Sequence, residues 1–159
     1  VALIKEKFKR IDLIPIIESV VDDYNNIHQA KSNIKITFYN DGKKDYIING
    51  IETRIEQIIA NLLDNAISFS KNGQNVEVKV AKNLNNQVII NIIDEGPGFK
   101  ERDTSKIFKR FYSNRPDKFG QHSGLGLNIV KNLVELHKAS ITASNRADNN
   151  GANIEIIFP

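Results

Sequence analysis

The stretch Gly120-Gln121-His122-Ser123-Gly124-Leu125-Gly126-Leu127-Asn128-Ile129-Val130 joins a basic, aromatic segment to an amphipathic helix. Glycines that lead into a helix let its first backbone N–H groups approach a phosphate closely. Such turns are common, so this stretch indicates a phosphate site only in combination with two further motifs. Asn61 and Asn65 are spaced by one helical turn, and Asp94-Glu95-Gly96-Pro97-Gly98 ends an apolar run. The three motifs together predict a nucleotide pocket.

The composition is that of one globular domain, with 159 residues, 40% of them hydrophobic and 26% charged. There is no cysteine, which excludes disulfides and thiolate metal sites, and the three histidines lack metal-ligand spacing. No apolar run approaches the roughly 20 residues that span a bilayer. No signal peptide is visible and the first residue is Val1, so we expect a fragment of a longer protein.

The positive charge is concentrated in one segment. Residues 99–120 carry seven Lys and Arg against three Asp and Glu, whereas the whole chain has a net charge of +3. A basic segment beside a glycine loop suits a polyphosphate ligand, and a solvated charged loop is the alternative. Nucleic-acid binding is disfavoured because the basic residues do not spread over an extended face.

Hydrophobic periodicity predicts an α+β fold: a two-layer α/β sandwich with a mixed, mostly antiparallel sheet and three helices on one face. Asp12 is the expected N-cap of the first helix. The turn at 40–43 is expected to join its flanking strands as a hairpin. Residues 88–93 are apolar on both faces and should form a central strand. We expect helices at about 12–29, 53–70 and 124–137, and strands at about 34–39, 46–51, 76–80, 88–93, 140–144 and 152–158.

Residues 95–123 show no regular period, which predicts a functional loop or lid. Within this segment Ile107-Phe108-Lys109-Arg110-Phe111-Tyr112 places aromatic side chains next to cations. The aromatic rings can anchor the loop by burial while Lys109, Arg110 or Arg115 reach phosphates. A short amphipathic turn with a solvated face is the alternative.

Asn61 and Asn65 project from one helix face, beside Asp64 and Ser68. A carboxamide oxygen can ligate Mg²⁺, which prefers hard oxygen ligands, although a merely polar helix side would have the same pattern. Asp94, at the end of a strand, can accept a hydrogen bond from the exocyclic amine of adenine, or can simply begin a turn.

A triphosphate can sit on the backbone N–H groups of residues 123–127. The spacing and the missing Lys-Ser/Thr ending exclude a P-loop, and the late position of the glycines fits a Rossmann fingerprint poorly.

The motifs, in this order and spacing, resemble the catalytic and ATP-binding domain of sensor histidine kinases over essentially the whole chain. The resemblance implies the ATP-binding fold shared with Hsp90, type II topoisomerase ATPase and MutL-like domains. The four matching stretches are the N box Asn61-Leu62-Leu63-Asp64-Asn65-Ala66, the G1 box Asp94-Glu95-Gly96-Pro97-Gly98, the F box Ile107-Phe108-Lys109-Arg110-Phe111-Tyr112, and the G2 box Gly124-Leu125-Gly126-Leu127.

The resemblance also implies roles for individual residues. Asn65 would ligate Mg²⁺, Asn61 would touch the phosphates, Asp94 would read the adenine amine, and residues 95–123 would form the ATP lid. Ser113 stands where many relatives carry an arginine, so Arg110 and Arg115 join Asn61 as catalytic candidates. Further nucleotide contacts are implied for Ser68 (Lys, Arg or His in many relatives), Phe69, Gly96, Gly98, Ile107, Phe108, Phe111, Ser123, Gly124, Leu125, Gly126 and Leu127.

The implied function is transfer of the γ-phosphoryl group of Mg-ATP to a histidine on a separate helical-hairpin dimerisation domain. The settings of His28, His122 and His137 do not match that phosphoacceptor. Residues 1–11 would be a linker or leading strand from the hairpin, and residues 12–159 the catalytic domain. The implied partners are the hairpin of a homodimeric parent and a response regulator. The implied location is the cytoplasmic side of a membrane-anchored parent, with no membrane contact by this chain.

Two alternatives stay open on the sequence. The first is an ATPase or serine-directed kinase of the same superfold. Asn61 stands where such ATPases carry a catalytic glutamate, and Glu56 lies farther upstream, which argues against hydrolysis. The second is a degenerate interaction module that binds no nucleotide. The presence of Asn65, Asp94 and the glycines of both glycine boxes argues against it.

Overall fold

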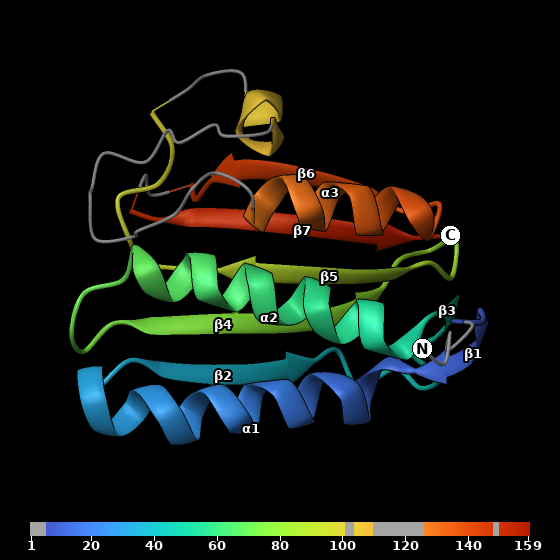
Figure 1. Ribbon diagram of the computed structural model, residues 1–159, viewed down its shortest axis with the longest axis horizontal. Helices are drawn as coiled ribbons and strands as arrows, with labels where there is room; N and C mark the ends of the chain where they lie inside the picture. The colour runs from blue at the N-terminus through green and yellow to red at the C-terminus, as the bar shows by residue number, and fades with distance from the viewer. Residues whose placement is uncertain (1–5, 101–103, 110–125, 148–149) are drawn as a thin grey trace, which may run out of the picture.

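A five-stranded mixed sheet, covered on one face by three helices, forms the body of the computed structural model (Figure 1). The structure describes residues 6–100, 104–109, 126–147 and 150–159. The strand order is β2-β4-β5-β7-β6, in which only β2 and β4 pair in parallel. The strands are β2 (Lys35–Asn40), β4 (Asn75–Lys82), β5 (Val88–Ile93), β6 (Ser140–Asn145) and β7 (Ala152–Phe158).

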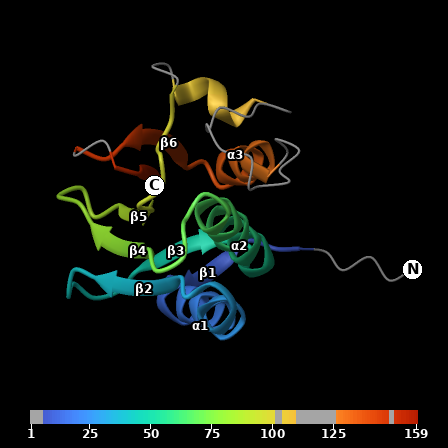
Figure 2. The ribbon, with the colours of Figure 1, turned by 90° about the vertical axis from the view of Figure 1, so that its left-hand side faces the viewer.

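The helices α1 (Leu13–Ser32), α2 (Glu52–Ser68) and α3 (Gly126–Leu136) lie side by side on the sheet (Figure 2). This arrangement confirms the predicted two-layer sandwich, with β5 as its central strand. Asp12 caps α1 as expected, since its Oδ1 accepts a hydrogen bond from the Ile14 N–H at 3.0 Å. Helix α1 continues to Ser32, three residues beyond the predicted end, and stops at Asn33, which adopts a left-handed conformation.

Alternation along the strands determines which side chains reach the core. In β4, β5 and β7 every second residue is buried against the helices, and its neighbours point to the open face of the sheet. The apolar stripe of α2 packs onto this layer. Burial of these side chains is the main stabilising contribution. The stripe of α2 comprises Ile55, Ile58, Ile59, Leu62, Leu63 and Ala66.

The predicted hairpin between residues 34–39 and 46–51 is wrong. β2 pairs with β4, whereas β3 (Ile47–Gly50) pairs with the leading strand β1 (Lys9–Asp12) in a separate two-stranded sheet. The intervening turn is tied to the end of β4 as well as to its own flanking residues. The Asp41 carboxylate accepts hydrogen bonds from the Lys82 N–H at 2.9 Å and from the Tyr46 hydroxyl. The bond to Lys82, 41 residues along the chain, attaches the turn to β4, with which β2 pairs.

Candidate functional site

The last two turns of α2 present a half-buried polar face, formed by Asn61, Asn65 and Ser68. Neither of the two asparagine carboxamides makes a hydrogen bond to any residue that the structure describes. Ser68 donates its hydroxyl to the Asn65 carbonyl at 2.8 Å. Half-buried amides without protein partners in the described residues are available to a ligand, because amide groups seldom stay unpaired away from water.

Asp64, between the two asparagines, is held from the neighbouring helix. Its Oδ1 accepts a hydrogen bond from the Tyr24 hydroxyl of α1 at 2.9 Å. Burial and this bond to a carboxylate raise the pKa of the Tyr24 phenol well above its ordinary value of 10.0. Tyr24 therefore stays a neutral donor at physiological pH and keeps the Asp64 carboxylate turned towards α1.

Asp94 directly follows β5 and is only 3% exposed. Its Oδ1 accepts hydrogen bonds from the Gly96 N–H at 3.0 Å and the Ala152 N–H at 3.2 Å, while its own N–H donates to the Ala152 carbonyl at 3.0 Å. The backbone thereby orients the carboxylate.

The loop after Asp94 packs against the end of α2. A Cβ on Gly96 would lie 2.4 Å from the carbonyl oxygen of Phe69, the residue that ends α2. Only glycine permits this approach, which brings Asp94 and Phe69 together. Gly98 has a φ of +74°, and a Cβ there would lie 2.6 Å from Asn145 Oδ1.

The first half of the predicted lid is attached to the body by side chains. Ile107 and Phe108, in the short helix η1 (Thr104–Phe108), are buried in the main core. The Thr104 hydroxyl donates to the Ala143 carbonyl of β6, and Asn128 of α3 donates to the Phe108 carbonyl at 3.1 Å. Burial of Ile107 and Phe108 thus anchors η1 between β6 and α3.

At the start of α3 the structure describes Gly126 and Leu127. Leu127 packs against the core, whereas a Cβ on Gly126 would meet no atom of the described residues within 4 Å. Contacts with the described residues therefore do not explain the glycine. The other predicted site residues lie outside the described ranges: Arg110, Phe111, Arg115, Ser123, Gly124 and Leu125.

Sequence reasoning missed two residues that build this end of the molecule. Asn145, at the end of β6, accepts a hydrogen bond from the Phe99 N–H at 2.6 Å and donates to the Phe99 carbonyl at 2.9 Å. Gly151 has a φ of +136°, and a Cβ there would lie 1.9 Å from the Asp94 carbonyl oxygen. No local pattern marks Asn145, and the sequence Asn149-Asn150-Gly151 indicates only a turn.

Figure 1 shows that α2 and α3 run in opposite directions, so the end of α2 and the start of α3 lie at the same edge of the sheet. Asp94 and its glycine loop lie at this edge too, packed on Phe69. The fold thus brings half-buried amides, a buried carboxylate and a helix start that no described residue crowds into one region. This arrangement defines a two-layer sandwich domain with a candidate nucleotide site. None of the helices in the described ranges has the length and apolar character needed to cross a membrane.

Comparison with known proteins supports this class and identifies the family. The sequence profile described as "Histidine kinase-, DNA gyrase B-, and HSP90-like ATPase" matches residues 50–159, and the chain belongs to this family. Sensor protein ChvG of Agrobacterium fabrum is 35% identical over 148 residues, which cover 89% of this chain and 25% of ChvG. The chain thus spans about a quarter of the length of that relative.

Solved structures agree with the assignment. The catalytic domain of histidine kinase ThkA, in a nucleotide-free form, superposes with a TM-score of 0.81 at 27% identity, over 96% of this chain and 95% of that domain. A complex of ThkA with the response regulator TrrA matches with a TM-score of 0.77 at 25% identity, over 96% of this chain and 41% of the ThkA chain. The fold is therefore that of histidine kinase catalytic domains.

Proposed function

We propose that this chain binds ATP with Mg²⁺ and, within a longer sensor kinase, supplies the γ-phosphoryl group to a histidine on a separate helical-hairpin domain. The observation that carries the proposal is the buried Asp94 carboxylate, oriented by two backbone N–H groups, at the same edge of the sheet as the Asn61 and Asn65 amides. Membership of the ATPase family supports nucleotide binding.

Each residue has a role that its chemistry permits. Asp94 would accept a hydrogen bond from the adenine amine, beside the loop that Gly96 packs against Phe69. The Asn65 carboxamide oxygen would hold Mg²⁺, and the Asn61 amide would donate to a phosphate oxygen. When bound, ATP supplies the phosphoryl group, and the protein contributes position and charge neutralisation. Arg110 and Arg115 are the candidate cations for the γ-phosphate.

The partner proposals follow from the same chemistry. Phosphoryl transfer to histidine breaks the bond between the γ-phosphorus and its bridging oxygen and forms a P–N bond, with ADP as the leaving group. His137 is buried with both ring nitrogens hydrogen-bonded, so it is not presented as a nucleophile. His28 stacks on Tyr24, and His122 lies outside the described residues. The acceptor would then lie on the hairpin domain. The complex of ThkA with TrrA supports a response regulator as the later acceptor.

Calorimetric titration of ATP, with and without Mg²⁺, tests the proposal. We expect Asp94→Asn to weaken ATP binding about 10- to 100-fold, because a charge-assisted hydrogen bond is lost and a carboxamide NH2 donor replaces one of the carboxylate acceptors. We expect Asn65→Ala to remove mainly the magnesium dependence. Asn132→Ala is the matched control, since Asn132 is an exposed asparagine of α3. Failure of the unmodified chain to bind any adenine nucleotide would overturn the proposal.

A further inference from the structure

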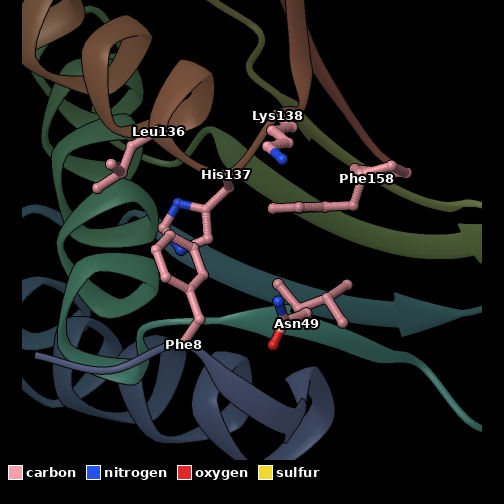
Figure 3. A pocket seen from close by; sticks show the side chains of 8 residues that line it. Phe8, Asn49, Leu136, His137, Lys138 and Phe158 are labelled. Carbon is pink, nitrogen blue, oxygen red and sulfur yellow. The ribbon is translucent and has the colours of Figure 1, made fainter.

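His137 lies immediately after α3, at the end of the molecule opposite the candidate site (Figures 1 and 3). Its side chain is buried, and both ring nitrogens are hydrogen-bonded. Nε2 is 3.1 Å from the Ile51 N–H, and Nδ1 is 2.7 Å from the Leu133 carbonyl oxygen. A backbone N–H can only donate, so Nε2 is the acceptor and Nδ1 carries the proton that Leu133 accepts. The imidazole is therefore held in one neutral tautomer.

This acceptor completes the start of α2. Ile51 is the N-cap residue of α2 and is buried, and no side chain of its own segment caps the helix. In a capping box, a Glu or Gln at the third helical position accepts the N–H of the N-cap residue. That position is Arg54 here, which has no acceptor. His137, immediately after α3, accepts the Ile51 N–H instead. Gly50 permits the contact, since a Cβ there would lie 3.1 Å from the imidazole Cδ2.

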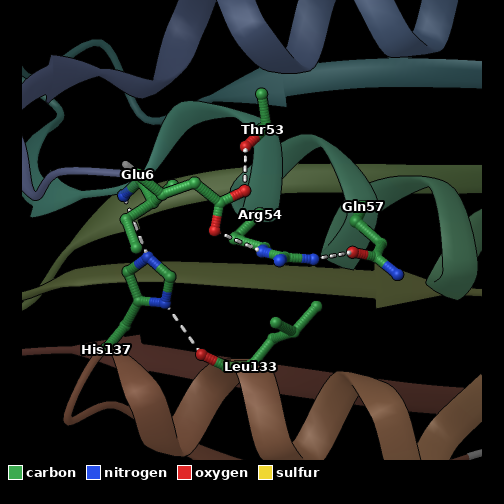
Figure 4. A network of polar contacts seen from close by, with 7 residues as sticks. Glu6, Thr53, Arg54, Gln57, Leu133 and His137 are labelled. Atoms are coloured by element: carbon green, nitrogen blue, oxygen red, sulfur yellow. Dashed lines mark hydrogen bonds and ion pairs between the residues drawn. The ribbon is translucent and has the colours of Figure 1, made fainter. Parts of the chain in front are cut away.

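The leading segment, residues 6–12, is attached at the same point. The Phe8 ring packs edge-on against His137 with ring centroids 5.2 Å apart. Glu6 accepts hydrogen bonds from Arg54 Nε at 2.9 Å and from the Thr53 hydroxyl at 3.3 Å, in the first turn of α2 (Figure 4). A pocket of about 350 Å³ lies beside Phe8 and His137.

We propose that His137 is a positioning residue: it holds the start of α2 against the end of α3, so that the far ends of both helices keep the spacing that nucleotide binding requires. The inference rests on the proposed nucleotide binding. Asn65 lies 14 residues beyond Ile51 on α2, about 21 Å along the helix axis. If α2 moves as one rigid body, a change at the His137 contact shifts the position of Asn65. By reciprocity, nucleotide binding near Asn65 changes the surroundings of Phe8.

The first test compares two substitutions at His137 by calorimetric titration of Mg-ATP. We expect His137→Leu, which keeps bulk but has no acceptor, to weaken binding about ten-fold, within the usual range of coupling between linked sites. His137→Gln offers a carbonyl oxygen in place of Nε2, and we expect it to bind nearly as tightly as the unmodified chain. Ile36→Ala, a buried change in β2, controls for loss of stability at a distance from the contact.

The second test uses a spectroscopic signal. The chain has no tryptophan, so Phe8→Trp introduces a single fluorescent reporter at a side chain that is 42% exposed. We expect saturating Mg-ATP to shift its emission, and we expect His137→Leu in the same background to abolish the shift at saturation. A purely structural role for His137 predicts an unchanged shift in that double variant.

The outcomes separate this inference from the proposed function. If the unmodified chain does not bind Mg-ATP, the proposed function fails. If it binds, and His137→Leu binds equally well or the emission of Phe8→Trp does not respond to Mg-ATP, then His137 does not position the site. Should His137→Leu fail to fold, a tenfold loss of affinity in folded His137→Gln would overturn the role assigned to the acceptor, and the response of Phe8→Trp still tests the coupling.

Discussion

The conformation of Asp94 depends on residues far along the chain. Its carboxylate is oriented by the N–H of Ala152 as well as by that of Gly96, and its carbonyl oxygen lies against Gly151. The turn before β7 therefore forms part of the candidate adenine site. A substitution in this turn would be expected to displace Asp94 without removing any group that meets the ligand.

Gly151→Ala tests this dependence. A Cβ at residue 151 would lie 1.9 Å from the Asp94 carbonyl oxygen, at a φ of +136°. We expect a loss of about 3 kcal/mol in the free energy of unfolding, measured by urea denaturation. Gly42→Ala is the matched control, because Gly42 also has a positive φ but a Cβ there would meet no atom of the described residues within 4 Å. That change should cost only about 1 kcal/mol. Equal losses in the two variants would refute the close approach.

Asn145 holds the start of the predicted lid through paired hydrogen bonds to the backbone of Phe99. We expect Asn145→Ala to lower the free energy of unfolding by about 1–2 kcal/mol and to speed hydrogen exchange at the Phe99 amide. The exposed Asn85, in the turn after β4, provides the control variant Asn85→Ala. Unchanged exchange at Phe99 in Asn145→Ala would show that other contacts hold the segment.

Among the elements, the turn between β2 and β3 is organised by a single carboxylate. Burial opposes ionisation of Asp41, but hydrogen bonds from Tyr46 and from the backbone N–H groups of Lys82 and Lys43 outweigh it and lower the pKa of Asp41 below 3.8. Burial and the bond to Asp41 raise the pKa of Tyr46 from 10.0 to about 12. The Tyr46–Asp41 hydrogen bond therefore stabilises this turn at pH values between the pKa of Asp41 and that of Tyr46.

The alkaline side gives a test. A raised pKa means that the stabilisation from Tyr46 is fully present below pH 10 and is lost as the pH rises to about 12. We expect Tyr46→Phe to lower the free energy of unfolding by about 1 kcal/mol at pH 7 and to reduce its decline between pH 10 and 12. Tyr39→Phe is the control, because Tyr39 is 47% exposed. If the free energy of unfolding declined equally between pH 10 and 12 in the two variants, the contact between Tyr46 and Asp41 would not contribute to stability.

For the molecule as a whole, ligand binding and phosphoryl transfer should be separable. Mg-ATP at about 100 times its dissociation constant should add about 2.7 kcal/mol to the free energy of unfolding. For a chain of this size, that corresponds to a rise of roughly 5–10 °C in the melting temperature. We expect differential scanning fluorimetry to show this rise, with little or no phosphate incorporated from labelled ATP. Strong self-phosphorylation of this chain would contradict an acceptor histidine on another domain.

Local patterns account for most of the architecture. Period-3.6 and period-2 hydrophobicity located the helices and the strands of the main sheet, because the residues that face the core repeat along each element. The apolar residues on both faces of 88–93 placed β5 at the centre, and helical spacing assigned Asn61 and Asn65 to one helix face. The ligand roles of those residues remain predictions, as do those of Arg110 and Arg115.

Contacts between distant parts of the chain decided the rest. The pairing of β2 with β4, the attachment of Asn145 to Phe99 and the bond from Ile51 to His137 join residues 40 to 86 positions apart. Pairing partners of this kind are selected by the packing of whole elements and by the need to satisfy buried N–H groups. The sequence alone was enough to predict the class of fold and the candidate site residues. Three-dimensional packing determined which contacts hold the two ends of α2.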